Sequence, residues 1–439
     1  MRITLVLASL VVLGGSLGAA ALSATSEPSF ARARSYAVGL DPVSVAIGDL
    51  NADGRPDLAA ANYESDTVSV LLNRGGHTFE AQLGYPTGRH PQTVAIGDVN
   101  GDSKPDLATA NEADDTVSVL LNAGDAGFQS SLDYPTGRGP WSVAIGDLNA
   151  DGKPDLVTVN GAPGANTVSV LINSGDGFRP SLDYATGRKP GDVEIGDLNA
   201  DGKPDLVTVN ARDNTASVLL NGGDGSFRAK LDYATGLAPA SVVIGDLNAD
   251  GKPDLAAANE HDNTVSALLN RGDGSFRTKV DYATGGGPWS IAIGDLNGDG
   301  EPDLANVITS NAVSVLTNRG DGSFEDKLDF ATGTSPSEVA IGDLNGDGRL
   351  DLATSNEEAN TISVLLNTPG LCTVQHLWRM TLPVAKRTLA RANCRVGTIR
   401  RAYSKLKRGR VIREKPKAGT VLPKGGKVTL VISLGRRPS

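Results

Sequence analysis

Acidic loops recur along most of this sequence and have the composition of a calcium site. Gly-Asp dipeptides place an aspartate at residues 49, 98, 147, 197, 246, 295 and 343, at intervals of 48 to 50 residues. Counted from each of these residues, positions 1, 3, 5 and 9 are Asp, Asn, Asp and Asp, and position 6 is Gly except for Ser103. Calcium takes six to eight oxygen ligands from alternating positions of a tight loop. Carboxylates that converge without a cation repel one another, so the pattern predicts up to seven calcium ions.

In each loop the side chains at positions 1, 3, 5 and 9 and the backbone carbonyl at position 7 are the predicted ligands. They belong to Asp49, Asn51, Asp53, Arg55 and Asp57; Asp98, Asn100, Asp102, Lys104 and Asp106; Asp147, Asn149, Asp151, Lys153 and Asp155; Asp197, Asn199, Asp201, Lys203 and Asp205; Asp246, Asn248, Asp250, Lys252 and Asp254; Asp295, Asn297, Asp299, Glu301 and Asp303; and Asp343, Asn345, Asp347, Arg349 and Asp351. The competing interpretation is that Asp and Asn only form hairpin turns. The second loop is the weakest candidate because Ser103 replaces the glycine.

Short strands must hold each loop. Every repeat contains four segments of strand composition, separated by clusters of Asn, Asp, Gly and Pro. In the fifth repeat these segments are 241–245, 254–259, 264–270 and 276–282. Four strands per unit of about 40 to 50 residues are typical of a β-propeller blade, and a solenoid is the competing repeat architecture.

The two ends of the repeat region complete one another. The seventh repeat stops after three strands at Asn367. Residues 29–39 match residues 226–236 in length and in the placement of their turn residues, and Phe30 corresponds to the phenylalanine of that segment. A ring closed in this way leaves no open sheet edge. We therefore expect an all-β, seven-bladed β-propeller over residues 29–369, closed by an N-terminal outer strand, and a small α+β domain over residues 371–435.

The loops and their spacing resemble the FG-GAP and VCBS repeats, the family that includes the integrin α-subunit propeller. The resemblance covers residues 29–367. It implies calcium in the loop between the first and second strands, on one face of the propeller, and a protein or glycan ligand on the opposite face. Trp141 and Trp289 are candidates for a stacking surface on that opposite face, and packing at the blade starts is an equally good explanation for them.

The C-terminal segment is strongly basic. Residues 371–439 hold 18 Lys and Arg with Glu414 as their one acidic residue, which leaves 23 basic and 50 acidic residues in the rest. A helix is predicted over 384–393, and strands over 396–402, 409–414 and 427–433. Residues 371–435 resemble a PASTA domain, notably over 415–425 and 428–435, although Gln375 and Arg379 stand where Pro and Gly are usual. The resemblance implies contact with peptidoglycan, and the charge favours an anionic cell-wall polymer. Docking on the acidic propeller and a solvated surface are the alternatives.

Two features predict export. Residues 1–24 have one basic residue, an apolar stretch and a run of small residues, which is typical of a cleaved signal peptide, with an uncleaved membrane anchor as the alternative. Cys372 and Cys394 are the only cysteines, and an exported chain is expected to join them in a disulfide. The predicted location is secreted or at the surface of a bacterial-type cell envelope.

These features favour a binding function. We expect a calcium-binding scaffold for adhesion, monomeric, with no catalytic residues and no nucleic-acid ligand, because the four histidines are scattered and aromatic residues are sparse in the basic segment. The alternative is an extracellular polysaccharide lyase or hydrolase built on the propeller. In that case Glu194 would act in the central channel with a carboxylate partner that the sequence does not identify.

Overall fold

The computed structural model describes residues 27–437 except 77, 369–371, 393 and 423–425. The chain folds as two compact units, a ring of sheets and a small C-terminal domain. The predicted signal peptide lies outside the described residues and stays a prediction. Within the part of the chain that is described, no helix has both the length and the apolar character needed to cross a bilayer.

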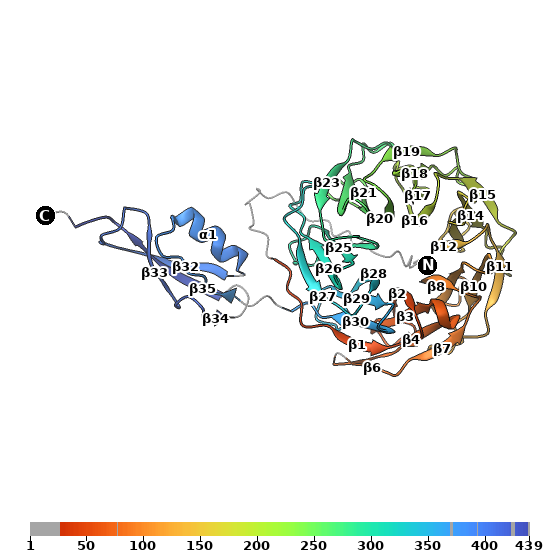
Figure 1. Ribbon diagram of the computed structural model, residues 1–439, viewed down its shortest axis with the longest axis horizontal. Coiled ribbons are helices and arrows are strands. Elements are labelled where there is room, and N and C mark those ends of the chain that lie inside the picture. Colours follow the sequence, from red (N-terminus) through yellow and green to blue (C-terminus); the bar gives the residue numbers. More distant parts are fainter. Residues whose placement is uncertain (1–26, 77, 369–371, 393, 423–425, 438–439) are drawn as a thin grey trace. The chain divides into compact units, whose positions relative to one another are not determined.

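Seven four-stranded antiparallel sheets, counted over the described residues, form the ring (Figure 1). The first strands lie innermost and are β2 (Pro42–Gly48), β8 (Pro91–Gly97), β12 (Pro140–Gly146), β16 (Pro190–Gly196), β20 (Pro239–Gly245), β24 (Ile291–Gly294) and β28 (Pro336–Gly342). The second strands are β3 (Asp57–Asn62), β9 (Asp106–Asn111), β13 (Asp155–Asn160), β17 (Asp205–Asn210), β21 (Asp254–Asn259), β25 (Asp303–Ile308) and β29 (Asp351–Asn356). The predicted propeller is confirmed.

The two outer strands complete each blade. The third strands are β4 (Thr67–Leu71), β10 (Thr116–Leu120), β14 (Thr167–Leu171), β18 (Thr215–Leu219), β22 (Thr264–Leu268), β26 (Ala312–Leu316) and β30 (Thr361–Leu365). The outermost strands are β7 (Leu83–Pro86), β11 (Leu132–Pro135), β15 (Leu182–Ala185), β19 (Leu231–Ala234), β23 (Val280–Ala283), β27 (Leu328–Ala331) and β1 (Arg34–Ala37). The first blade also carries a short helical turn, η1 (Tyr63–Ser65), and a small hairpin of β5 (Asn73–Gly75) and β6 (Thr78–Phe79).

The core lies between neighbouring sheets. Every residue of the second strands is buried, because each blade is covered on both faces by its neighbours. One apolar cluster joins Val207 and Val218 of the fourth blade to Leu255 and Phe276 of the fifth. Burial on both faces explains why these strands read as continuous small and apolar residues and not as an alternating pattern.

The N-terminal strand closes the ring. β1 pairs antiparallel with β30, with Arg34 opposite Val364 and Ala37 opposite Thr361. The sheet order β1-β30-β29-β28 therefore combines the two ends of the repeat region in one blade. This closure was predicted from the missing fourth strand of the seventh repeat, and it is confirmed.

The outermost strands are shorter than predicted. In the fifth repeat the strand expected over 276–282 is β23, at Val280–Ala283. Phe276 precedes it and makes an isolated bridge to Asn270. Its side chain is 4% exposed, and its ring meets the Tyr233 ring edge-on at 5.2 Å between centroids. Five other described Tyr–Phe pairs repeat this geometry. Phe276 therefore lies outside the regular outermost strand, with one backbone bridge and with its side chain packed between two blades.

Asparagines at the ends of the third strands join the blades. Asn270 donates Nδ2–H to the carbonyls of Leu198, in the neighbouring blade, and Pro253, at 2.8 and 2.7 Å. Asn73 makes the same bond to Leu344, across the seam between the first and seventh blades, at 2.8 Å. Asn122, Asn173, Asn221, Asn318 and Asn367 make equivalent bonds. The sequence alone presents these residues only as turn formers.

Replacing one of these asparagines is expected to destabilise the ring. Asn270→Ala leaves the carbonyls of Leu198 and Pro253 and the amide of Gly272 without their partner. We expect a loss of about 2–4 kcal/mol in the free energy of unfolding, measured by denaturant titration. Gln129→Ala, at an exposed side chain, is the control and should cost less than about 0.5 kcal/mol. Equal stabilities for the two variants would contradict the inter-blade role.

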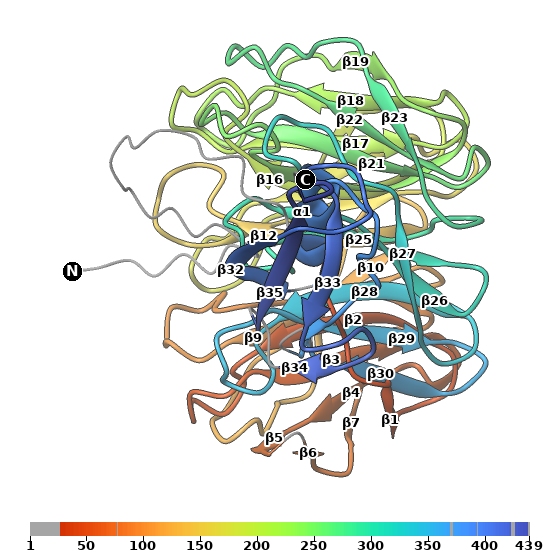
Figure 2. The same cartoon turned by 90° about the vertical axis from the view of Figure 1, so that its left-hand side faces the viewer.

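The C-terminal domain is a small α+β fold (Figure 2). Its three-stranded sheet has β35 (Gly426–Ser433) in the centre, parallel to β32 (Cys394–Ala402) and antiparallel to β33 (Val411–Lys415). Helix α1 (Leu382–Arg391) buries Ala385 and Leu389 in the domain core. β31 (Cys372–Thr373) pairs with β34 (Val421–Leu422). The helix begins two residues earlier than predicted, since Pro383 is compatible with a first helical turn.

Candidate functional site

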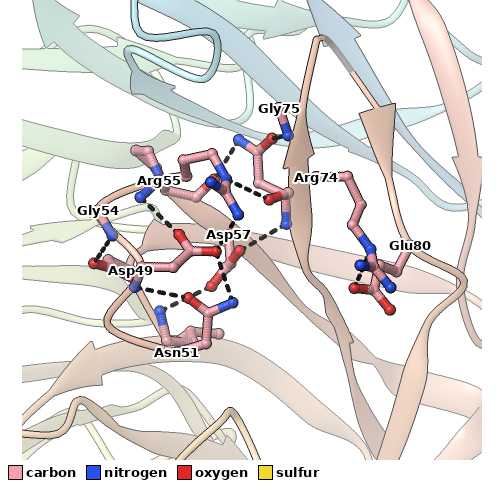
Figure 3. Close-up of polar contacts among 12 residues, drawn as sticks. Asp49, Asn51, Gly54, Arg55, Asp57, Arg74, Gly75 and Glu80 are labelled. Atoms are coloured by element: carbon pink, nitrogen blue, oxygen red, sulfur yellow. Dashed lines mark hydrogen bonds and ion pairs between the residues drawn. The ribbon is translucent and has the colours of Figure 1, made fainter.

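The acidic loops are tight turns that connect the first and second strands of each blade. In the first loop the Asp49 carboxylate accepts the N–H groups of Asp53 and Gly54 at 3.1 and 2.8 Å (Figure 3). The Asn51 carbonyl oxygen accepts the Asp53 N–H at 3.0 Å, and the Asp53 carboxylate accepts the Arg55 N–H at 2.9 Å. The side chains at positions 1, 3 and 5 therefore point into the turn.

The second loop forms the same turn despite its serine. Ser103 adopts a left-handed φ of 66°, where Gly54 of the first loop has 81°. Its N–H still donates to Asp98 at 2.7 Å. A side chain is strained in this conformation and glycine is not, so the serine reduces stability without changing the path of the chain.

The aspartate at position 9 is buried beneath the turn. Asp57 accepts the N–H groups of Leu50 at 2.9 Å and of Asn73 at 2.7 Å, and it is fully buried. Burial raises its pKa to about 6; the two N–H bonds oppose the shift, and the charges of Asp53 and Asp49 add to it. Asp106, Asp155, Asp205 and Asp254 accept N–H groups from the equivalent residues of their own repeats, and burial raises their pKa values to about 6 as well. This residue links the turn to the third strand, a structural role that sequence reasoning missed.

A basic side chain at position 7 pairs with the carboxylate at position 5. Arg55 lies 2.5 Å from Asp53, and Lys252 lies 3.1 Å from Asp250. The loops of Lys104, Lys153, Lys203 and Arg349 contain the same pair. Both partners are partly exposed, and such pairs contribute at most about 1 kcal/mol. The prediction used only the backbone carbonyl of these residues and missed the cation.

The donor chemistry of the loops fits calcium. Each offers carboxylate, amide and carbonyl oxygens, and the nearby charges of Asp53 and Asp49 add to the rise that burial causes in the pKa of Asp57. As placed, however, no three acidic, His or Cys side chains among the described residues converge closely enough to hold a metal ion. Calcium binding therefore stays a prediction.

Trp141 and Trp289 meet at the end of the ring opposite the loops. They occupy equivalent positions at the starts of the third and sixth repeats, and their ring centroids lie 6.5 Å apart with planes tilted by 46°. Gly191 and Ala240 fill the same position in the two intervening blades, and their small size leaves room for both rings. Together these residues line a cavity of about 140 Å³, which we call the axial pocket. The two predicted residues therefore line the same cavity, and their role in ligand binding stays a prediction.

A ring of hydrogen bonds surrounds the axis at the level of the pocket. Ser44 accepts the Val94 N–H of the next blade at 3.1 Å, and Ser241 and Ser290 accept equivalent N–H groups. In the fourth and seventh blades carboxylates replace these hydroxyls. Asp192 accepts the Val242 N–H at 3.1 Å, and Glu338 accepts the Val45 N–H at 2.9 Å. Glu338 thereby links the seventh blade to the first.

Glu194 lies on β16, the innermost strand of the fourth blade, and the structure identifies its charged neighbours. Burial, with the charges of Asp192 and Glu338, raises its pKa to about 8. Burial raises the pKa of Glu338 to about 7, and that of Asp192 also rises. The other first strands have Ala or Val at the position of Glu194. Three carboxyl groups therefore share a region that holds little opposite charge.

The C-terminal domain presents its basic residues to solvent. Every Lys and Arg whose side chain is described in residues 372–437 is exposed. The one acidic side chain, Glu414, is 8% exposed, and its carboxylate lies 3.7 Å from Nδ1 of His376, which forms an ion pair with it only when protonated. The buried Cys394 belongs to the core of the domain. The side chain of Cys372 is outside the described set, so the disulfide stays a prediction.

Comparison with known proteins identifies both parts of the chain. The model of the FG-GAP-like repeat matches residues 49–109, 98–158, 197–257, 246–306 and 306–354, together more than half of the chain. The PASTA domain model matches residues 373–434. No curated protein sequence matches the chain.

Solved structures share the fold. The structure of BBS1N in complex with ARL6DN has a TM-score of 0.55 at 12% identity, covering 77% of this chain and 97% of that chain. An inactive virginiamycin B lyase from Staphylococcus aureus has a TM-score of 0.53 at 13% identity, covering 77% of this chain and 100% of that chain. A lectin from Agrocybe aegerita that recognises terminal N-acetylglucosamine has a TM-score of 0.47 at 20% identity, covering 69% and 91%. At these identities the first two bear on the fold alone.

Proposed function

Because the chain belongs to the FG-GAP-like repeat family and ends in a PASTA domain, we propose that it is a secreted or cell-surface binding scaffold. In this proposal the C-terminal domain attaches the protein to an anionic cell-wall polymer. The exposure of every described Lys and Arg side chain in that domain carries the proposal. A surface of exposed positive charges attracts a polyanion more strongly than a surface whose charges are already paired with carboxylates.

We further propose that the acidic loops bind structural calcium. The side chains at positions 1, 3, 5 and 9 and the carbonyl at position 7 would hold it. Bound calcium would supply positive charge beyond that of the basic side chain that most loops have at position 7. The weak exposed pairs between positions 5 and 7, such as Lys252 with Asp250, oppose binding only slightly. Calcium would then stabilise the blades and leave the opposite end of the ring for ligands.

The propeller is proposed to bind a protein or glycan at the axial pocket and not to process it. Asp192 and Glu338 already accept hydrogen bonds that join the blades, so catalysis with Glu194 would compete with the packing of the ring. If the propeller instead processes a polysaccharide, the purified protein should cleave polysaccharides and the Glu194→Gln variant should not.

Charge reversal in the C-terminal domain is expected to weaken attachment to cell walls. The variant Arg400→Glu with Arg401→Glu changes two exposed residues of β32. Retention of the full chain on purified cell walls should fall at least tenfold, and retention of the unmodified protein should fall with added salt because salt screens the attraction. Arg228→Glu with Arg277→Glu makes the same charge change at exposed propeller positions and should leave retention unchanged. Equal losses for both variants would overturn the assignment.

A further inference from the structure

The axial pocket combines aromatic faces with an excess of carboxylates. Its lining includes Asp192, Glu260, Glu338 and Glu357 and a single basic residue, Lys189. Glu194 lies two residues beyond Asp192 along the same strand and adds a further carboxyl group in the channel. Serine and threonine hydroxyls and the Gln92 amide complete the polar part of the lining. The pocket therefore has many hydrogen-bond acceptors and a shortage of positive charge.

The aromatic wall already accepts a cation. The Lys189 ammonium lies 5.5 Å from the centroid of the Trp141 ring, a geometry in which the negative face of the indole attracts positive charge. Trp289, the other aromatic wall, is 40% exposed, and the described residues place no cation over it. A second ammonium group could therefore lie between Trp289 and the carboxylates.

We propose that the axial pocket binds a small organic ammonium group, with the alkyl stem against Trp289 and the ammonium nitrogen near Asp192 and Glu338. This rests on the proposed binding role of the propeller and names the ligand chemistry. A cavity of about 140 Å³ can admit a small organic group, since a cavity of about 150 Å³ holds benzene. The group could be a free amine or a lysine side chain of a partner protein, which share this chemistry.

Binding should be linked to proton release. A cation favours ionised carboxylates, whereas burial and mutual repulsion raise the pKa of Glu338 to about 7 and of Glu194 to about 8. The pKa values of Asp192 and Glu357 are also raised by burial. Below these values protons compete with the ligand, so affinity should increase as the pH rises from 6 to 8.5. Glu260 and Lys189 are the other acidic and basic residues that line the pocket.

Calorimetry on the full chain tests the proposal. n-Butylammonium should bind at pH 8.5 and at least tenfold more weakly at pH 6, with protons released to the buffer, while n-butanol should not bind measurably. Trp289→Ala should weaken binding at least tenfold. Glu338→Gln, which keeps an acceptor for the Val45 N–H, should weaken it and flatten the pH dependence. Trp378→Ala, at a 45% exposed tryptophan of the C-terminal domain, is the matched control and should have no effect.

Further comparisons decide the source and the class of ligand. A capped Gly-Lys-Gly peptide that binds tenfold more tightly than n-butylammonium would identify a protein side chain, and equal affinities would identify a free amine; both support the proposal. Binding of n-butanol as tight as that of the amine, absence of amine binding at pH 8.5, or pH-independent binding of glucose or N-acetylglucosamine would overturn it. Retention on cell walls does not use this pocket, so loss of this inference alone would leave wall attachment intact.

Discussion

Removing calcium with EDTA is expected to lower the midpoint of thermal unfolding of the propeller by roughly 10–15 °C. With a Kd of ~10⁻⁴ M, typical of extracellular modules, millimolar calcium adds about 1.4 kcal/mol per site and about 10 kcal/mol for seven independent sites. An unfolding entropy of about 2.1 cal/mol/K per residue gives about 0.7 kcal/mol per degree for roughly 340 residues. Scanning calorimetry with calcium, and with EDTA followed by excess calcium, measures the shift.

A single-loop pair of variants separates calcium binding from turn formation. Asp250→Ala removes an exposed carboxylate at position 5 and should reduce the calcium response by about one site, or about 2 °C. Lys252→Ala removes the partner of that carboxylate but keeps the backbone carbonyl at position 7. The shift of the unfolding midpoint between calcium and EDTA should therefore equal that of the unmodified protein. If EDTA leaves the midpoint of the unmodified protein unchanged, the loops are ordinary turns.

Deleting residues 1–39 is expected to open the ring. The deletion removes β1, which pairs with β30, together with Tyr36 and Val38 of the cluster at the seam. Burial of these two side chains contributes about 5 kcal/mol, and the strand pairing adds to it. The exposed edge of β30 also becomes a template for aggregation. We expect the unfolding midpoint to fall by more than about 7 °C and oligomers to form in light scattering.

Two controls make this test specific. Deletion of residues 1–26 keeps β1 and should leave stability unchanged. A synthetic peptide of residues 29–39, added to the variant that lacks residues 1–39, should restore its unfolding midpoint by pairing with the exposed edge of β30. If the variant that lacks residues 1–39 stays monomeric and as stable as the full chain, closure of the ring does not depend on β1.

Much of the fold could be predicted because its signals are local and repeated. The Gly-Asp spacing, the strand composition between loops and the surplus strand at residues 29–39 each follow from the order of residues along the chain. The second strand of the fifth repeat was predicted at its observed bounds, Asp254–Asn259. The outermost strand was not, because Phe276 has strand composition but packs against Tyr233 of the neighbouring blade.

The candidate sites divide in the same way. The sequence by itself determined which oxygen donors each acidic loop contains and that the basic residues are concentrated at the C-terminus. Only the tertiary structure decided that Trp141 meets Trp289, that Asp192 and Glu338 are the neighbours of Glu194, and that Asn270 bonds to the blade before it. The reason is geometric: closing the ring brings blade starts that are far apart in sequence to one axis, and side chains of different blades meet there.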